Sequence, residues 1–328
     1  MTTLCGGWGY NNLGDEAILA GYLETVASNP LVYSVNPQKT IAAQCSAMTC
    51  LPESSRFSSK QDEVFMLCGG GYINGSWVPE VTRKLNRLQR LRGGRDLVAH
   101  GLELRSIKGK SARQLTKLFA GGQIAVRDEE SKTVALGVGI EATVLPDAIS
   151  LLAPHIEKYS TLIDTVQGRV LVNLLDITRR PDSVEAEISV DGWRKYCGDL
   201  VAALGDRALA LDIGSGDRDF ANELRIEVVT PRSVGEMVSL IASTDGIVSV
   251  RMHPALIGTI LGTPTVSIPY CGKVSPTLQA IGVQPVILYD LDVNETLERL
   301  EHRGSWAQEW SAATNLNQQW LEEHQRTV

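Results

Sequence analysis

The stretch GIVSVRMHPALIGTILGTPTVSIPYCGK, residues 246–273, constrains the fold of this chain more than any other part of it. Two short apolar runs rich in Val and Ile flank a segment of helical character, which a glycine and a proline separate from the second run. The pattern predicts a buried strand over Ile247–Val250 that ends in the polar triplet Arg251-Met252-His253. A helix over His253–Leu261 and a second strand over Thr265–Ile268 are expected to follow, and then Lys273. This order is typical of an open α/β sheet, which collects charged groups at the carboxyl ends of its strands.

The rest of the chain repeats this alternation of short apolar strands and helices, which predicts parallel, doubly wound sheets. At 328 residues the chain is too long for one ordinary domain and suits two of roughly 150 residues each. The expected fold class is α/β, with two Rossmann-like domains that face each other across a cleft, the plan of GT-B glycosyltransferases. We expect an N-terminal domain over 1–153, a C-terminal domain over 154–304, and a tail helix over 305–328 that returns to the first domain.

The charge balance excludes some classes of partner. The net charge is −7, and no run of Lys or Arg along the sequence resembles a stripe that could follow a phosphate backbone. We therefore expect no nucleic-acid partner and no polybasic membrane anchor. The amino terminus lacks a signal region, and no window approaches the ~20 apolar residues of a spanning helix. The expected location is the cytoplasm; a peripheral position at the inner face of the membrane and a homo-oligomeric state are left open.

The six cysteines indicate neither disulfides nor a metal site. They form no CxxC pair and have no neighbouring His at ligand spacing. Reduced thiols are expected because a chain of this size needs no disulfide staples.

A glycine-rich loop, GGWGYNNLGDEA at residues 6–17, follows the first predicted strand and leads into a helix near Asp15. Its backbone N–H groups and the helix dipole favour an anion, although Asp15 and Glu16 weaken the case for a phosphate there. Asn12 and Asp15 are candidates for contacts to the hydroxyl groups of a ligand such as a sugar; alternatively, Asp15 caps the helix. Farther on, Gly70 and Gly71 end another strand, where they either admit a ligand closely or form a tight turn.

Further candidates end the strands that follow. Arg127 comes directly after a buried strand, which suggests a site, and the alternative is a surface ion pair with Asp128 or Glu130. His100 also ends a strand, before a glycine, and is either a site residue or a structural histidine. Asp147, which follows a proline, is similarly a turn residue or a site carboxylate.

The sharpest signal is the combination of Arg251, His253 and Lys273. In an extended segment Arg251 and His253 point to the same side, which suits a substrate that has a carboxylate or phosphate and also needs a proton. The start of the helix beside them favours an anion, and Lys273 supplies another positive group. The alternative is that His253 only caps its helix and Arg251 is merely exposed.

These residues carry a resemblance to a known family. The chain resembles the polysaccharide pyruvyl transferases over nearly its whole length and in family order, in the motifs GGWGYNNLGDEAIL, CGGGYING, VRDEES, PDAISL and VSVRMHPALIGTILGTPTVSIPYCGK. The resemblance implies a GT-B-like enzyme that moves the enolpyruvyl group of phosphoenolpyruvate onto a sugar to form a pyruvate ketal. The chain departs from the family pattern in two segments, Tyr72–Trp77 and VAHGLELRS after Asp96, and both segments border the expected acceptor site.

The resemblance also implies roles for the candidate residues. His253 is the general acid/base, and Arg251, Arg127 and Lys273 hold the phosphate and carboxylate of the donor. The N-terminal domain is the acceptor side, where Asp15 orients or deprotonates a sugar hydroxyl. The implied partners are phosphoenolpyruvate as co-substrate, with no cofactor and no metal, and a sugar or polysaccharide precursor, free or lipid-linked. The residues expected to contact the acceptor are Asn12, Asp15, His100, Gly70 and Gly71.

Two other functions stay open. A GT-B nucleotide-sugar glycosyltransferase is expected to carry a Glu or Asp near the C-terminal sheet, and the chain has no acidic residue between His253 and Asp290. A non-catalytic sugar-binding relative would keep the fold without the proton chemistry, and the presence of both Arg251 and His253 argues modestly against it.

Overall fold

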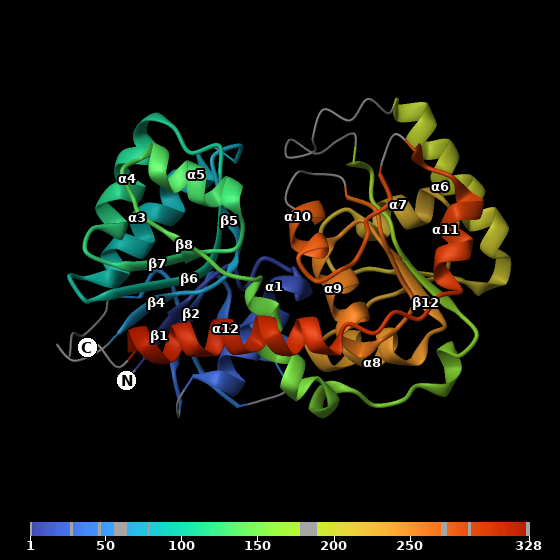
Figure 1. The fold of residues 1–328 in the computed structure, drawn as a ribbon, viewed down its shortest axis with the longest axis horizontal. Coiled ribbons are helices and arrows are strands. Elements are labelled where there is room, and N and C mark those ends of the chain that lie inside the picture. The colour runs from blue at the N-terminus through green and yellow to red at the C-terminus, as the bar shows by residue number, and fades with distance from the viewer. Residues whose placement is uncertain are drawn as a thin grey trace. The chain divides into compact units, whose positions relative to one another are not determined.

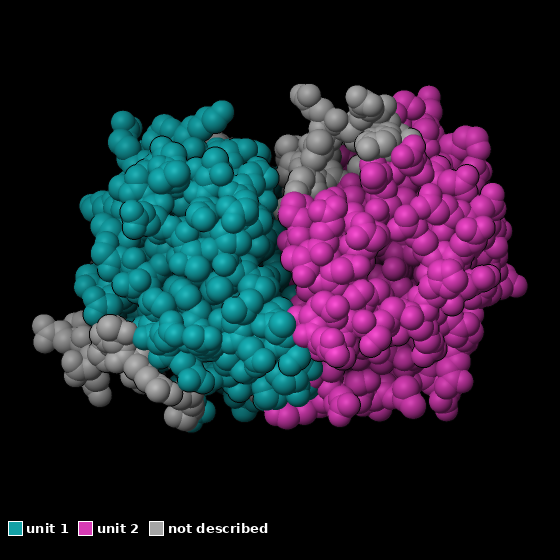
Figure 2. Space-filling model, in the orientation of Figure 1, with its two compact units in different colours: residues 1–10, 15–155, 311–328 teal, residues 11–14, 156–310 magenta. Residues whose placement is uncertain are grey.

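The computed structural model describes residues 2–26, 29–44, 47–55, 64–77, 79–177, 189–269, 274–287 and 290–325 (Figure 1). The chain forms two compact units (Figure 2). Unit 1 contains residues 1–10, 15–155 and 311–328, and unit 2 contains residues 11–14 and 156–310. The division at 155/156 lies beside the boundary expected at 153/154.

Unit 1 is built on a parallel sheet with the order β3-β2-β1-β4-β6-β7-β8, and β5 pairs with β6 off this path. Parallel sheets are covered on both faces, so their strands are buried along their length, as β1, β4 and β6 are here. The strands are β1 (Thr3–Cys5), β2 (Leu31–Ser34), β3 (Thr49–Pro52), β4 (Phe65–Leu67), β5 (Gly70–Asn74), β6 (Leu97–Arg105), β7 (Gln123–Val126) and β8 (Thr143–Val144).

Helices cover both faces of this sheet. Buried side chains of α3, α4 and α5 share one core cluster with alternate strand residues, among them Leu97 and Ala99 of β6. On the other face, Tyr22 of α1 and Asn317 of α12 both hydrogen-bond to His100 of β6. The helices of unit 1 are α1 (Leu13–Thr25), α2 (Pro37–Ala43), α3 (Glu80–Arg92), α4 (Gly109–Phe119), α5 (Glu129–Gly137), the 3₁₀ helix η1 (Ala148–Tyr159) and most of α12 (Ala307–Gln325).

Unit 2 has a second parallel sheet, with the order β11-β10-β9-β12-β13. Its strands are β9 (Val170–Asn173), β10 (Ala208–Leu211), β11 (Val228–Val229), β12 (Gly246–Ser249) and β13 (Thr265–Ser267). Its helices are α6 (Val190–Leu204), α7 (Asp217–Glu223), α8 (Val234–Ser243), α9 (Met252–Leu261), α10 (Val274–Gln279) and α11 (Val293–Leu300), with 3₁₀ turns at Asp164–Val166 and Gly205–Arg207. The carboxyl ends of the adjacent strands β10, β9 and β12 therefore carry polar residues to one edge.

Two segments belong to a unit other than that of their neighbours in sequence. Residues 11–14, which include the start of α1, group with unit 2, and from Ser311 onward α12 groups with unit 1. Within unit 2 the link is direct, because the Leu13 amide donates to the Ile213 carbonyl at 3.2 Å. Among the described helices none has the length and apolar character needed to cross a membrane.

Candidate active site

Arg251 and His253 lie at the start of α9, at the carboxyl end of β12. Arg251 is the N-cap residue, with extended backbone, and the Ser249 hydroxyl donates to its carbonyl at 2.8 Å. His253 already belongs to the helix and is 92% buried, since its relative exposure is 8%. The expected extended placement therefore holds for Arg251 and is wrong for His253, because the helix begins one residue earlier than expected. The alternative of His253 as the cap is also wrong, because the N-cap is Arg251.

The Arg251 guanidinium is held by a buried carboxylate that the sequence analysis did not single out. Its Nε lies 2.9 and 3.0 Å from the two carboxylate oxygens of Asp217, and its Nη2 donates to the Ser215 carbonyl at 2.9 Å. Asp217 also accepts from Asn173 Nδ2 at 3.0 Å and the Ile213 amide at 3.2 Å. Burial raises the pKa of the Asp217 carboxyl, and Arg251 acts in the opposite direction. Arg251 is thus oriented but partly neutralised.

The loop at Gly14 lies directly against His253, within unit 2. A Cβ atom on Gly14 would sit 2.5 Å from His253 Nδ1 and 2.7 Å from its Cβ, closer than real carbon contacts. Asn12 Oδ1 accepts from the Gly14 amide at 3.1 Å and so shapes the start of α1. A residue with any side chain at 14 would collide with the imidazole, which explains glycine in the N-L-G-D-E motif.

The N-terminus of α9 offers positive partial charge to an anion. Among the described residues no side chain caps this helix, and its first turn contains no acidic residue. The helix dipole favours a negative group at this position, and Arg251 adds a positive charge that Asp217 offsets in part. This end of α9 therefore carries positive potential beside the His253 ring.

Asp15, the next residue of α1, lies among glycines of unit 1. A Cβ atom on Gly7 would be 3.3 Å from Asp15 Oδ2, and one on Gly70 would be 3.3 Å from Oδ1. Gly70 has φ +124°, which glycine adopts readily, and Gly71 follows it, half-buried, in β5. The alternative role of Asp15 as helix cap is wrong, because α1 begins at Leu13. The structure thus brings Asp15 and Gly70 together.

Glu16, expected only to disfavour a phosphate, fixes the glycine-rich loop from inside the unit. Its Oε1 accepts from the Gly9 amide at 2.8 Å and the Thr40 hydroxyl at 3.2 Å, and its Oε2 accepts from Gln44 Nε2 at 3.1 Å. Burial raises the pKa of Glu16, and these hydrogen bonds act in the opposite direction. In the sequence, the only local sign of this structural role is the position of Glu16 directly after Asp15, on the inner side of the start of α1.

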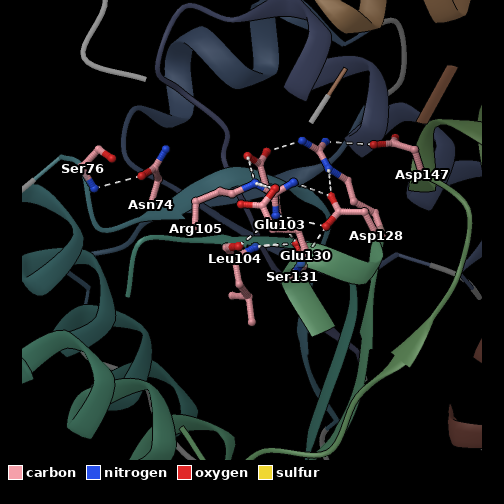
Figure 3. Close-up of polar contacts among 10 residues, drawn as sticks. Asn74, Ser76, Glu103, Leu104, Arg105, Asp128, Glu130, Ser131 and Asp147 are labelled. Carbon is pink, nitrogen blue, oxygen red and sulfur yellow. Dashed lines mark hydrogen bonds and ion pairs between the residues drawn. The ribbon is translucent and has the colours of Figure 1, made fainter. Parts of the chain in front are cut away.

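Arg127 belongs to a buried network of charges at the carboxyl ends of β6 and β7. Figure 3 labels its neighbours in this network, among them Glu103, Asp128 and Asp147. Its side chain is 1% exposed; it is paired with Glu103, and with Asp147 at 2.9 Å. Although burial disfavours its charge, the carboxylates of Glu103 and Asp147 raise the pKa of Arg127 above its ordinary value. The alternative of a surface pair with Asp128 or Glu130 is wrong: the contact to Asp128 is buried and long, at 3.8 Å, and Glu130 instead lies 3.3 Å from the neighbouring Arg105.

His100 is an interior residue of unit 1, with no exposed surface. Its Nδ1 lies 2.7 Å from the Tyr22 hydroxyl and its Nε2 lies 2.8 Å from Asn317 Oδ1. The ring also stacks on Trp320 of α12, with centroids 5.3 Å apart. Burial lowers the pKa of His100 to about 4. The acceptor contact expected for His100 does not fit these surroundings, and the structural alternative does.

Lys273, expected to bind the donor, lies outside the described residues, as does Tyr270. The structure therefore groups the remaining candidates into two sets. In unit 2, Asn12 and Gly14 lie with His253 and Arg251; in unit 1, Asp15 lies with Gly70, and Arg127 lies in its own charge network.

A comparison with models of known families shows which family the chain belongs to. The model of the polysaccharide pyruvyl transferase family matches residues 12–272, most of the chain. The chain belongs to this family. The match runs from the first residues of the N-L-G-D-E loop to the end of the strand-helix-strand stretch around His253, so it includes both groups of candidate residues.

Solved structures agree on the fold. Anabaena Alr3699/HepE, solved with UDP, is 12% identical, with all of both chains covered and a TM-score of 0.60. UDP-GlcNAc 2-epimerase from Methanocaldococcus jannaschii is 12% identical over 92% of each chain, with a TM-score of 0.53. A glycosyltransferase from Rickettsia africae is 11% identical over 98% of this chain and 97% of its own, also at 0.53. No curated protein matches the sequence. These likenesses confirm the expected α/β fold class with two Rossmann-like domains, the GT-B type.

Proposed function

We propose that this pyruvyl transferase family member transfers the enolpyruvyl group of phosphoenolpyruvate to two hydroxyls of a sugar in a glycan or glycan precursor. A proton adds to the methylene carbon of the donor and leaves a cationic carbon. One hydroxyl attacks that carbon, phosphate then leaves, and the second hydroxyl closes the ketal. Of the two protons that the hydroxyls lose, one restores the general acid that protonated the methylene carbon, and the other leaves with phosphate. The products are a pyruvate ketal and inorganic phosphate.

In this proposal unit 2 binds the donor. The N-terminus of α9 and Arg251 bind an anionic group of phosphoenolpyruvate, and Lys273 contributes a further charge. His253 supplies the proton to the methylene carbon as general acid. Asp217 holds the Arg251 guanidinium in one orientation, which positions the donor without touching it. The chemistry requires no metal in this scheme, because the cationic groups offset the charge of the donor.

Unit 1 carries Asp15 and Gly70, two of the acceptor residues in this proposal. Asp15 accepts a hydrogen bond from, or a proton of, the attacking sugar hydroxyl, and Gly70 beside it leaves room for the sugar to approach. Asn12, a residue of unit 2 that is half-buried just before α1, provides a further polar group to the acceptor.

The observation that carries the proposal is the packing of the family's loop on its histidine. Gly14 lies against the His253 ring so closely that no side chain fits between them. Such close packing fixes the imidazole in one position at the start of a helix, where an anion is favoured. A proton donor with a fixed ring beside an anion site suits the protonation of an anionic enol better than it suits sugar binding alone.

The deciding experiment mixes purified protein with phosphoenolpyruvate and a panel of oligosaccharides, and measures phosphate release and the mass of the glycan. We expect both phosphate and a pyruvyl ketal, and His253→Ala should lower turnover by roughly 100-fold or more. His302→Ala, which changes an exposed histidine of the same unit, is the matched control and should keep full activity. Consumption of a nucleotide sugar, with phosphoenolpyruvate ignored, would replace the proposal with a glycosyltransferase.

A further inference from the structure

Positive charge is concentrated in one part of this acidic protein. Residues 80–117 contain eleven Lys and Arg against three Asp and Glu, while the rest of the chain contains twenty against thirty-five. The excess is therefore +8 in this segment and −15 elsewhere, for a net charge of −7. The segment comprises α3, β6 and α4 of unit 1.

The exposed cations of this segment form two rows. On α3, Arg83, Arg87 and Arg90 follow one another at helical spacing, and all three are exposed. On α4, Lys110, Arg113 and Lys117 do the same. Residues spaced by three or four positions lie on one side of a helix, so each row extends for about 10 Å along its axis.

The two helices lie side by side on the same face of the sheet (Figure 1). Gln114 Nε2 of α4 donates to Asn86 Oδ1 of α3 at 2.6 Å, which sets their register. Leucines on the inner side of both helices, including Leu88 and Leu115, belong to one core cluster. The outer sides carry the two rows, which together with Lys108 we call the α3/α4 basic face.

Stability of the helices does not explain this placement. Like charges one turn apart repel each other, and Lys108 and Lys110 stand at the N-terminus of α4, where the helix dipole disfavours cations. Within α3 and α4 the only carboxylate is Glu80, which pairs with Arg83 at 2.7 Å. Glu53, the buried partner of Lys84, lies on the inner side of α3 and not beside the exposed rows. Most of the basic face therefore has no compensating charge on its own helices.

We propose that the α3/α4 basic face binds the surface of a membrane containing anionic lipids. Basic residues near such a surface each contribute to binding, and several act together. Trp77, 42% exposed, lies one turn before α3, where its carbonyl accepts from the Val81 amide at 3.0 Å. An exposed tryptophan beside cations is typical of proteins that lie at a lipid headgroup region.

The shape of this face favours a membrane over a soluble polyanion. The cations project from the outer sides of two adjacent helices, and single-stranded nucleic acids are instead bound in grooves lined by stacking aromatic residues. We expected no polybasic anchor because the sequence contains no continuous run of Lys and Arg. The fold instead builds this face from cations that are separated in the sequence and brought together on α3 and α4. A membrane position would bring the enzyme to a lipid-linked acceptor.

The test is sedimentation of the protein with vesicles, in the absence of donor and acceptor. We expect binding to vesicles of phosphatidylcholine mixed with phosphatidylglycerol, loss of binding at high salt, and no binding to phosphatidylcholine alone. The double variant Arg87→Glu, Arg113→Glu should bind the mixed vesicles roughly tenfold or more weakly. The control, Arg232→Glu with Arg303→Glu, makes the same change in net charge at exposed sites of unit 2 and should bind as the wild type does.

Two outcomes would overturn the inference. Absence of binding to mixed vesicles at low salt excludes it, and so does equal loss of binding in both double variants. Binding to heparin but not to vesicles would assign the face to a soluble polyanion instead. Phosphate release with a soluble acceptor, measured on the same variants, should match the wild type, so failure of the proposed transferase reaction is detected separately.

Discussion

Replacing Gly14 with alanine tests whether the loop fixes the histidine. The new Cβ atom would lie 2.5 Å from His253 Nδ1 and 2.7 Å from His253 Cβ. Rotation of the imidazole relieves the first contact but not the second, because the Cβ atom is attached to the backbone of α9. Either the start of α1 or the first turn of α9 must therefore move. An added methyl group in a packed site costs about 1–3 kcal/mol.

Alanine itself favours the helix, so the two effects must be separated. Gly198 lies in the middle of α6 in the same unit, and a Cβ atom there meets nothing within 4 Å. Gly198→Ala should therefore stabilise the protein by about 0.5–1 kcal/mol, through helix propensity alone. For Gly14→Ala the collision outweighs this gain, and we expect a net loss of about 1–2 kcal/mol.

Thermal unfolding and initial rates together distinguish the explanations. Gly198→Ala should raise the midpoint by about 1–4 °C and leave the rate unchanged. Gly14→Ala should lower the midpoint by about 2–8 °C and lower kcat by roughly 100-fold, because a proton donor displaced by about 1 Å loses its alignment. If Gly14→Ala instead gained stability as the control does and kept its rate, the close packing on His253 would have no functional role.

Two further predictions concern buried groups. Asp217→Asn removes the charge that faces Arg251 and should lower the free energy of unfolding, measured in urea, by about 1–3 kcal/mol. The control is Asp212→Asn, which should cost less than about 1 kcal/mol because the partner of Asp212, Arg218, is exposed. Equal effects of the two variants would contradict the role of burial. The pKa of His100 is lowered from 6.5 to about 4, so His100 binds a proton more readily in the unfolded chain than in the folded one. Its contribution of about 3 kcal/mol to the free energy of unfolding is therefore present above pH 6.5 and is lost as the pH falls toward 4. His100→Gln should flatten the dependence of the free energy of unfolding on pH in this range, and an unchanged slope would exclude His100 as its source.

The fold could be predicted because its signals are local. Short apolar strands, each ended by glycine or a polar residue, appear in the sequence at the positions of β1, β4, β7, β10 and β12. β3, an edge strand with mostly exposed residues, lies in a segment with no clear pattern, because an edge strand buries too little to need one.

The candidate site was predictable only in part, because several of its contacts join distant residues. His100 looks like a site histidine until α12 returns and Asn317 and Trp320 enclose it, a contact 217 residues apart in sequence. Asp217 looks like an ordinary helix-start acid until Arg251 is placed beside it. Periodicity and strand ends show which residues reach an edge of a sheet, but they do not show which partner will be buried there.

The two strand-end arginines show how such partners decide chemistry. Arg127 contacts the carboxylates of Glu103 and Asp147, and its charge is more than offset within its own network. Arg251 has one carboxylate partner, Asp217, and also the N-terminus of α9, whose dipole adds positive potential. An anion near Arg127 must first displace or protonate a carboxylate, and one near α9 need not. Donor binding is therefore expected to depend more on Arg251 than on Arg127, which stays a predicted donor contact.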